Sequence, residues 1–454
     1  MEKLAGVEIG QQAPMKKIAF ASFIGTAIEF YDFYIYGTAA ALVFGGVFFP
    51  DLSPVAGTLA SFATFGVAFL ARPLGGALFG HFGDRLGRKA MLIFSLLVMG
   101  IATFLVGLLP GYAAIGIAAP ILLVLLRFLQ GIGLGGEWGG AVLMAAEHSP
   151  PDKRAFYSGF AQVGPPVGFL LSSGLFLLFS SSLSNEQFAS WGWRIPFLFS
   201  IVLVGVGLFV RATVAETPVF KEVMESRTEA QVPIVDVLRT YPRTVALATL
   251  AGSVMFTFFF VITTFSLSYG VTQLRLEQST MLYCVMVSIA LMGAGIMFFA
   301  TVSDKVGRRN LSLLSTGVLA LWAFPMFWLV DTRSPVLITL AFSVSLVAWS
   351  AMYGPMGAFF SELFGTRVRY SGASLSYALA GVVGGSLAPY ISARLLASTG
   401  SSWPVSLYLL IAAVVSFVSL LLLSETYRTD LATTRAEERQ LIAESQDSNG
   451  VRDT

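Results

Sequence analysis

The chain carries one charged pattern twice, in Gly80–Lys89 (GHFGDRLGRK) and in Ala300–Arg309 (ATVSDKVGRR). Both stretches contain Asp-basic-x-Gly-basic-basic, and further matching residues follow each copy. They are Glu147 with Arg154 and then Glu216-Thr217 after the first copy, and Glu362 with Arg369 and then Glu425-Thr426 after the second. Three signals repeated in the same order at a similar offset indicate a duplication whose two halves run in parallel orientation.

The composition predicts that both halves lie in a membrane. Hydrophobic residues make up 56% of the chain and charged residues only 12%, whereas a soluble domain is about a quarter charged. Apolar runs of about 18 residues or more, long enough for a transmembrane helix, recur along the chain. A barrel would show short alternating strands instead. We therefore expect an all-α membrane protein with twelve transmembrane helices in two pseudo-symmetric six-helix bundles.

The expected spans follow from the apolar runs and the charges between them. In the first half they are Ile18–Phe44, Val55–Gly80, Ala90–Leu109, Ile115–Ala146, Phe156–Ser180 and Gly192–Val214. In the second half they are Val245–Tyr269, Thr280–Thr301, Leu311–Val330, Pro335–Phe360, Tyr370–Leu396 and Val405–Leu423. This divides the chain into an N-terminal segment (1–17), a bundle (18–215), a linker (216–243), a second bundle (244–424) and a tail (425–454).

The basic residues predict the orientation, because short cytoplasmic loops accumulate lysine and arginine. The loops on one predicted side hold Lys16, Lys17, Arg85, Arg88, Lys89, Lys153, Arg154, Lys221, Arg227, Arg239, Arg243, Lys305, Arg308, Arg309, Arg367 and Arg369. We therefore expect both termini to be cytoplasmic and the protein to lie in the cell (inner) membrane. The polar stretch Met1–Pro14 lacks the order of a cleavable signal, so the first span is expected to be retained.

The repeated charges also predict a cytoplasmic gate. Glycine permits the sharp turn, and Asp84, Arg85 and Arg88 can pair with Glu147 and Arg154 at the end of the same half. Such pairs can hold one conformation and must loosen in another. The equivalent residues of the second half are Asp304, Arg308, Glu362 and Arg369. The alternative is that these residues only set the orientation, but the repeated aspartate and the spaced Glu-Arg pairs favour the gate.

Several motifs resemble those of a known family. The loop at Gly80–Lys89 and its copy resemble the signature loop of the major facilitator superfamily. Within that superfamily, the chain is similar to the metabolite:proton symporter family. The motifs that carry this similarity are Arg72-Pro73-Leu74-Gly75-Gly76, Gln130-Gly131, Gly135-Gly136-Glu137-Trp138-Gly139-Gly140, Trp191-Gly192-Trp193-Arg194-Ile195-Pro196-Phe197 and Ala215-Glu216-Thr217-Pro218.

The resemblance implies proton-coupled uptake of a small organic acid by alternating access. The family includes shikimate, 2-oxoglutarate, citrate and proline/betaine carriers, and the shikimate type is the most similar over Phe62–Lys89 and Gly133–Gly140. Its implied partners are an organic anion, protons and the lipid bilayer, with no nucleic acid, no cofactor beyond the proton gradient, and a functional monomer. Symport of a zwitterion such as betaine or proline, and proton-coupled export, are the alternatives.

Charged side chains inside predicted spans are candidates for function, because each costs about 2.5–3.5 kcal/mol or more at mid-membrane. The first half holds Glu29, Asp32, Arg72, Arg127 and Glu137. One interpretation is a structural ion network that joins three spans. The functional interpretation makes Asp32 the proton carrier, since a change in its distance from Arg127 can move it between charged and neutral forms. This pair also resembles the aspartate–arginine pair of proton-coupled sugar porters. Glu29 is the competing proton site.

Predicted substrate contacts combine polar and aromatic side chains on cavity-facing spans: Tyr36, Arg72, Glu137, Gln162, Tyr353 and Tyr377. Arg72 can grip a carboxylate bidentately or be neutralised by a nearby glutamate. Gln162 is placed like the sugar-binding glutamine of the sugar porters, but it can equally bond a neighbouring helix. Pro165-Pro166 and Gly354-Pro355 predict helix interruptions where the cavity opens.

Other functional classes find no support in the sequence. The chain contains no His-Glu-x-x-His, no Gly-x-Ser-x-Gly and no Gly-x-x-x-x-Gly-Lys-Ser/Thr, which removes three common enzyme motifs. Its single cysteine, Cys284, excludes an internal disulfide and a cysteine cluster for a metal. We therefore predict a transporter and not an enzyme.

Overall fold

The computed structural model describes residues 15–86, 88–135, 153–213, 233–365 and 368–427, and within these ranges it is helical, with no strand. The first half contains α1 (Met15–Leu42), α2 (Phe44–Phe48), α3 (Pro54–Leu86), α4 (Arg88–Leu108), α5 (Tyr112–Ile115), α6 (Ala118–Gly135), α8 (Arg154–Ser182), α9 (Asn185–Gln187), the π-helix η2 (Phe188–Gly192) and α10 (Arg194–Thr213). Along the chain, helix α12 (Pro233–Thr240) comes between the two halves.

The second half repeats this plan. It contains α13 (Pro242–Phe260), the π-helix η3 (Val261–Phe265), α14 (Ser266–Thr272), α15 (Gln278–Val306), α16 (Arg308–Val330), α17 (Pro335–Glu362), α18 (Arg369–Gly384), α19 (Ala388–Thr399) and α20 (Trp403–Leu422). Ten helical segments of the described chain are long and apolar enough to cross a membrane. The shorter apolar helix Ile93–Leu108 and the 28-residue α1 complete the twelve predicted spans. The predicted fold class is confirmed.

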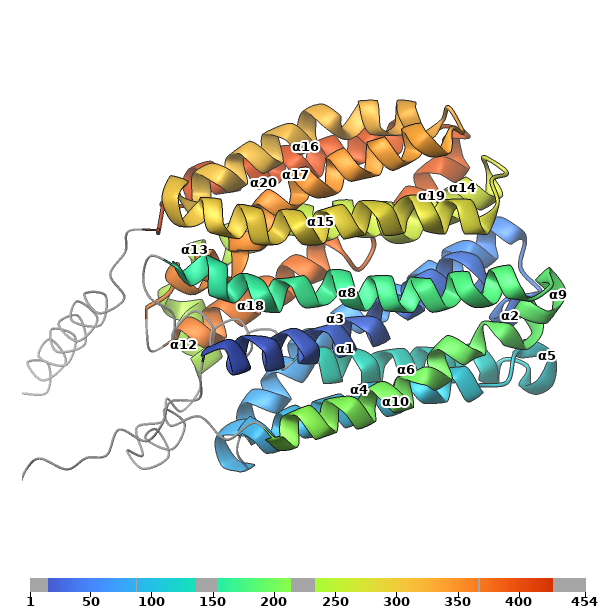
Figure 1. Ribbon diagram of the computed structural model, residues 1–454, viewed down its shortest axis with the longest axis horizontal. Coiled ribbons are helices and arrows are strands. Elements are labelled where there is room, and N and C mark those ends of the chain that lie inside the picture. The colour runs from blue at the N-terminus through green and yellow to red at the C-terminus, as the bar shows by residue number, and fades with distance from the viewer. Residues whose placement is uncertain (1–14, 87, 136–152, 214–232, 366–367, 428–454) are drawn as a thin grey trace, which may run out of the picture.

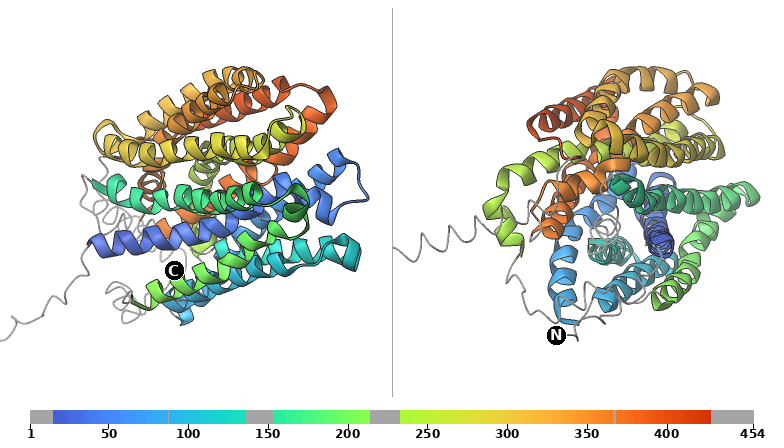
Figure 2. Two further views of the ribbon diagram at one scale, coloured as in Figure 1. Left: turned by 45° about the vertical axis from the view of Figure 1, so that its right-hand side comes forward. Right: turned by 60° about the vertical axis from the view of Figure 1, so that its left-hand side comes forward.

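The two halves lie side by side with their helices roughly parallel (Figure 1). In that view the blue-to-green helices of the first half occupy the lower part, and most of the yellow-to-red helices of the second half, α15, α16, α17 and α20 among them, occupy the upper part. Helices α13 and α18 of the second half lie at the height of α8, and the turned views of Figure 2 agree. Helix α8 packs along α1 of its own half and along α15 and α17 of the other, while α3 packs against α18 and α19. Residues from both halves therefore meet along the middle of the molecule.

Helices α1, α8 and α16 begin at one end of the bundle, and α20 ends there; this end is on the left in Figure 1. We call this the basic end, and the opposite end, at which α9 and α14 lie, the far end. The first and last described helices thus open and close at the same end of the molecule, as expected for an even number of spans.

Glycines bring α3 and α6 into close contact. A methyl group added at Gly131 would overlap the carbonyl oxygen of Ala68, and one added at Gly135 would overlap that of Arg72. Small residues allow helices in a membrane to approach this closely. This close approach of the two helices places Arg72 of α3 near Arg127 of α6. The glycines of α6 therefore help to position both cations inside the first half.

Two spans of the second half depart from a regular α-helix where they contact the first half, one through a π-helical turn and one through an interruption. The span that begins with α13 passes through η3, and π-helical turns of this kind are frequent at functional sites. The span of α18 and α19 is interrupted at Gly385–Leu387, and a Cβ at Gly66 of α3 would lie 2.5 Å from the carbonyl oxygen of Ser386. On the other side, a Cβ at Gly37 of α1 would lie 3.1 Å from the hydroxyl oxygen of Thr264 in η3.

The proline pairs do not interrupt their helices, and the bends predicted at them stay a prediction. Helix α8 continues through Pro165 and Pro166, and α17 continues through Pro355. A membrane helix can tolerate proline because neighbouring helices and side chains bond the backbone groups that proline leaves free. The described departures from regular α-helix lie instead at η3 and at the interruption between α18 and α19.

Candidate functional site

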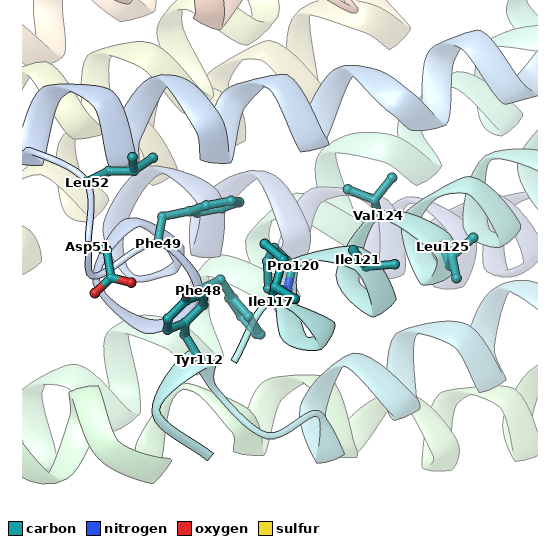
Figure 3. A pocket seen from close by; sticks show the side chains of 10 residues that line it. All are labelled: Phe48, Phe49, Asp51, Leu52, Tyr112, Ile117, Pro120, Ile121, Val124 and Leu125. Carbon is teal, nitrogen blue, oxygen red and sulfur yellow. The ribbon is translucent and has the colours of Figure 1, made fainter. Parts of the chain in front are cut away.

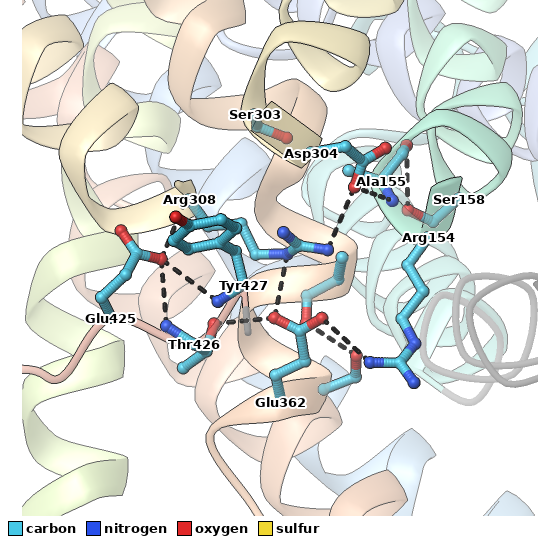
Figure 4. A network of polar contacts seen from close by, with 12 residues as sticks. Arg154, Ala155, Ser158, Ser303, Asp304, Arg308, Glu362, Glu425, Thr426 and Tyr427 are labelled. Carbon is cyan, nitrogen blue, oxygen red and sulfur yellow. Dashed lines mark hydrogen bonds and ion pairs between the residues drawn. The ribbon is translucent and has the colours of Figure 1, made fainter. Parts of the chain in front are cut away.

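An ionic network joins the two halves at the basic end (Figure 4). The carboxylate of Asp304, on α15, accepts hydrogen bonds from the backbone N–H groups of Ala155 and Phe156, each at 3.1 Å. These groups lie in the first turn of α8, where a negative charge is stabilised by the helix dipole and by unpaired N–H donors. Asp304 also accepts a hydrogen bond from Arg308 at 3.1 Å. A side chain of the second half therefore caps a helix of the first.

Glu362, at the end of α17, is the centre of the same network. Its carboxylate lies 2.9 Å from Nε of Arg308 and 3.7 Å from Nη1 of Arg154, and it accepts a hydrogen bond from the Thr426 hydroxyl at 2.7 Å. The side chain of Glu362 is fully buried. Since Arg154 begins α8, this ion pair is a second contact that crosses between the halves.

The residues after α20 are tied into the network. The carboxylate of Glu425 accepts hydrogen bonds from the backbone N–H groups of Arg308 at 2.9 Å and Asn310 at 3.2 Å, so it caps α16. Arg309 in turn donates to the carbonyl oxygens of Leu420 and Leu421 at the end of α20. These contacts give the Glu425-Thr426 repeat a structural role within the second half.

The structure describes only some of the residues predicted to form the cytoplasmic gate. Asp304, Arg308, Glu362 and Arg154 meet at the basic end, and Arg369 is buried at the start of α18. The side chains of Asp84, Arg85 and Arg88 and the whole of Glu147 lie outside the described part of the chain, so the pairing predicted within the first half is not addressed. The ion pair that is described for Arg154 crosses to the other half.

Asp32 and Arg127 are both buried in the first half but do not form a direct pair. Among the described residues, no ion pair within 4.0 Å joins them. Arg127 donates from Nη1 to Gln130 at 3.1 Å, and Gln130 donates to the Thr103 hydroxyl at 2.8 Å. Thr103 lies beside Asp32 but donates to the Met99 carbonyl at 2.9 Å. Neither carboxylate oxygen of Asp32 accepts a hydrogen bond within the described chain.

Aromatic rings enclose the guanidinium of Arg127. Its central carbon lies 4.4 Å from the ring centre of Phe33, 4.1 Å from that of Tyr36 and 4.9 Å from that of Phe65. The Tyr36 hydroxyl donates to Thr64 at 2.8 Å. Tyr36, predicted as a substrate contact, thus packs against Arg127 and does not line the central cavity described next. Cation–π contacts of this kind stabilise a buried arginine where no carboxylate does.

A small cavity lies between the halves and contains Arg72. It is lined by Phe30, Tyr34, Arg72, Met255, Phe256, Phe259, Phe260, Trp349, Tyr353 and Tyr377. The room inside it, about 20 Å³, is enough for about one water molecule. The walls come from α1 and α3 of one half and from α13, α17 and α18 of the other. A larger ligand therefore requires the halves to separate.

The guanidinium of Arg72 has aromatic neighbours and no carboxylate. Its central carbon lies 4.7 Å from the ring centre of Phe33 and 4.9 Å from that of Phe69. Among the described residues, no carboxylate lies within ion-pair distance of it, and its Nε has no hydrogen-bond partner. The hydroxyls of Tyr34, Tyr353 and Tyr377 lie close enough to interact with it electrostatically.

Two other predicted residues complete the surroundings of the cavity. Gln162, on α8, donates from Nε2 to the backbone carbonyl of Tyr353 at 3.0 Å, so it bridges the halves beside the cavity. Glu29 is buried on α1, next to Asp32 along the helix. Glu137 lies outside the described residues. Within the described chain, no group of three or more histidine, cysteine or acidic side chains could hold a metal ion.

The comparisons with known proteins identify the family. Residues 22–389 match the model of the Major Facilitator Superfamily. The chain belongs to this superfamily. It is 46% identical to the inner membrane metabolite transport protein YhjE of Escherichia coli (strain K12), over 91% of this chain and 95% of that protein. It is also 43% identical to the shikimate transporter of the same strain, over 91% and 95%, and 32% identical to its proline/betaine transporter, over 98% and 92%.

Solved structures show the same fold. The proton:xylose symporter XylE aligns with a TM-score of 0.73 over 93% of this chain and 98% of that chain, at 18% sequence identity. That likeness concerns the fold alone. The chain belongs to the Major Facilitator Superfamily, and its similar relatives are transporters. It is therefore a multi-pass membrane transporter and not an enzyme.

A larger groove of this major facilitator protein lies away from the central cavity (Figure 3). It has a volume of about 460 Å³ and is lined by Phe48, Phe49, Asp51, Leu52, Tyr112, Ile117, Pro120, Ile121, Val124 and Leu125. Apart from Asp51 and Tyr112 the lining is apolar, and all of it comes from the first half. A groove within one half cannot be exposed alternately on two sides by a movement between the halves, so the central cavity is the better candidate for the transport site.

Sequence reasoning missed several lining residues. Trp349 donates its indole N–H to the Met255 carbonyl at 2.8 Å and stacks on Tyr353 with 4.3 Å between ring centres. Trp349 lies four residues before Tyr353, so both side chains lie on one face of the helix. This spacing could have identified Trp349 as a lining residue. The phenylalanines of α13 carried no such signal, because aromatic residues are common throughout the chain.

Proposed function

We propose that this transporter is a symporter that imports a small organic acid together with protons by alternating access. The observation that carries the proposal is Arg72, a buried guanidinium with no carboxylate partner among the described residues, in a cavity between the halves. A cation in such a low-dielectric site attracts an anion strongly, and its planar fork can bind a carboxylate through two parallel hydrogen bonds. The Tyr34 hydroxyl, which also interacts with Arg72, can add a donor to the same ligand.

Asp32 is the proposed proton carrier. Its carboxyl group is buried, has no cation within ion-pair distance among the described residues, and has only the Thr103 hydroxyl beside it as a described polar neighbour that could donate. A proton can neutralise such a group, and an acidic residue inside a membrane span is a candidate for proton relay. Glu29, on the same helix, is the alternative carrier. Arg127 is the proposed partner, linked to Asp32 through Gln130 and Thr103 instead of by a direct ion pair.

The contacts at the two ends support alternating access. At the basic end the halves are joined through Asp304 and through the pair of Arg154 and Glu362. Toward the far end, α1 and α3 contact η3 and the break between α18 and α19. Opening either end requires one set to separate while the other stays closed. We assign the basic end to the cytoplasm, because basic residues concentrate in cytoplasmic loops, and take the monomer as the functional unit.

Substitution of Arg72 tests the anion site. In proteoliposomes with an inward proton gradient, Arg72→Lys keeps the charge but loses the fork, so uptake of a carboxylate substrate is expected to need a higher concentration for half-saturation. Arg194→Lys is the control, because Arg194 bonds the Leu109 carbonyl and stacks on Trp193 away from the cavity. An unchanged half-saturation concentration for Arg72→Lys would make Arg72 structural.

Symport of a zwitterion is the second candidate. The proline/betaine relative is 32% identical, and the cavity has aromatic walls that suit a quaternary ammonium group through cation–π contacts. Direct competition between betaine and shikimate for uptake distinguishes the candidates. Export is distinguished by direction: an imposed inward proton gradient drives substrate into the vesicle for a symporter and out of it for an antiporter.

A further inference from the structure

The groove shown in Figure 3 opens on the surface that faces the bilayer. Its apolar wall includes Pro120, Ile121, Val124 and Leu125, which lie in α6, one of the helices long and apolar enough to span a membrane. Ile121 and Leu125 stand one turn apart, and they are 54% and 52% exposed. Together with Ile117, which is also exposed, they form a stripe about 12 Å long down the helix. In a membrane this stripe faces hydrocarbon and not water.

One end of the groove is polar. Asp51 lies between α2 and α3, and Tyr112 begins α5, so both belong to the far end of the first half. The Tyr112 hydroxyl donates a hydrogen bond to the Asp51 carboxylate. Tyrosine is enriched where a membrane meets water, so this pair marks the level of the lipid headgroups. Figure 3 shows Asp51 and Tyr112 toward one end and Leu125 at the other, which is the order of polar and apolar parts in a phospholipid.

The charge at the polar end selects among headgroups. Asp51 is the one charged side chain among the described lining residues. The segments that supply the whole lining, 43–71 and 101–126, contain no lysine or arginine. Arg194 bonds backbone carbonyls and stacks on an indole ring, and it does not line the groove. An anionic headgroup therefore finds no cation here, whereas an ammonium group finds a carboxylate that can accept more bonds than the one from Tyr112.

We propose that this groove binds one acyl chain of a membrane phospholipid whose headgroup carries a primary ammonium group, and that the ammonium bonds Asp51. A primary ammonium supplies both a positive charge and N–H donors, so its bond to a carboxylate is charge-assisted. A choline headgroup carries the charge but no N–H donor, and a glycerol headgroup leaves the lipid with a net negative charge. The inference does not depend on which substrate the protein transports.

Native mass spectrometry of the purified full-length protein tests the headgroup. The probes are phosphatidylethanolamine, phosphatidylcholine and phosphatidylglycerol with identical acyl chains. We expect phosphatidylethanolamine to bind about five-fold more tightly than phosphatidylglycerol, which is the upper end of the scale for an exposed ion pair. Asp51→Asn keeps the shape of the side chain and should remove this preference. Glu277→Gln is the matched control, because Glu277 is exposed at the far end of the second half and does not line the groove.

A second pair of variants tests the groove itself. Val124 lines the groove and is half-buried, so Val124→Trp should fill the space and weaken the binding of all three lipids alike. Val414→Trp is the control, because Val414 is exposed on α20 of the second half and adds its bulk away from the groove.

Three results would overturn the proposal. A preference for phosphatidylethanolamine that survives Asp51→Asn would remove the assigned headgroup contact. Equal lipid binding by the Val124→Trp and Val414→Trp variants would remove the groove as the lipid site. A dimer that only Val124→Trp abolishes would show that a second copy of the chain occupies the groove. Because none of these measurements uses uptake, failure of the proposed function would leave them unchanged.

Discussion

Replacement of Asp304 by alanine should open the basic end of the transporter. The carboxylate accepts one hydrogen bond from each of two α8 backbone N–H groups, those of Ala155 and Phe156. A hydrogen bond to a charged group contributes about 1.5–3 kcal/mol. At the lower bound, the two bonds that cross between the halves together contribute about 3 kcal/mol. The loss should therefore shift the ratio of closed to open molecules about 100-fold toward open, because 1.4 kcal/mol is a factor of ten.

The distance between two spin labels measures this shift. Leu78 of α3 and Leu314 of α16 are exposed on different halves, and Cys284→Ser removes the native thiol. After Leu78→Cys and Leu314→Cys labelling, Asp304→Ala should populate longer distances than the parent protein. Arg309→Gln is the control, because Arg309 bonds only carbonyl groups of its own half among the described residues. A distribution for Asp304→Ala that matches this control would refute the role of the cross-half cap.

Three further substitutions test other parts of the structure. Asp32→Asn should abolish proton-driven accumulation but spare exchange of substrate across the membrane, measured by uptake and counterflow; full accumulation would remove Asp32 as the carrier. Gln130→Leu leaves Arg127 without its described acceptor, so unfolding should cost about 1–3 kcal/mol less, seen as a lower thermal midpoint; an unchanged midpoint would show that the bond is dispensable. Gly384→Ala forces a methyl group into the backbone of α13 and should destabilise by about 1–3 kcal/mol. Gly205→Ala, with open space around it, should have no such effect.

The membrane fold could be predicted from the sequence because its signals are local. Each span is a continuous apolar run, and the repeated charges at Gly80–Lys89 and Ala300–Arg309 mark the same helix connection in each half. The π-helical turn at η3 and the interruption at Gly385–Leu387 were not predicted. The interruption at Gly385–Leu387 does have a local signal in Gly384-Gly385 and Pro389. The π-helical turn at η3 has no such signal in its own residues, Val261–Phe265. Pro165-Pro166 and Pro355, the expected signals for a break, stand in helices that continue.

The sequence could predict which buried charged residues belong to the candidate site, but not which side chains each of them contacts. Burial of Asp32, Arg72 and Arg127 follows from their positions in apolar spans. Their neighbours are set by how the helices rotate and pack. Asp32 and Arg127, predicted as switchable partners, form no direct ion pair among the described contacts. Likewise, Arg154 was matched to its own half by sequence spacing, while its described ion pair lies across the interface with Glu362.

The two buried arginines link the proposed proton site to the proposed anion site. Arg72 and Arg127 lie against the same ring, that of Phe33, at 4.7 and 4.4 Å from its centre. Two cations this close repel each other, and a carboxylate bound at Arg72 would offset that repulsion. Arg127 is tied through Gln130 to Thr103, which lies beside Asp32. The charge of a bound anion therefore acts on the side chain that sets the environment of the proposed proton carrier, which is the physical requirement for symport.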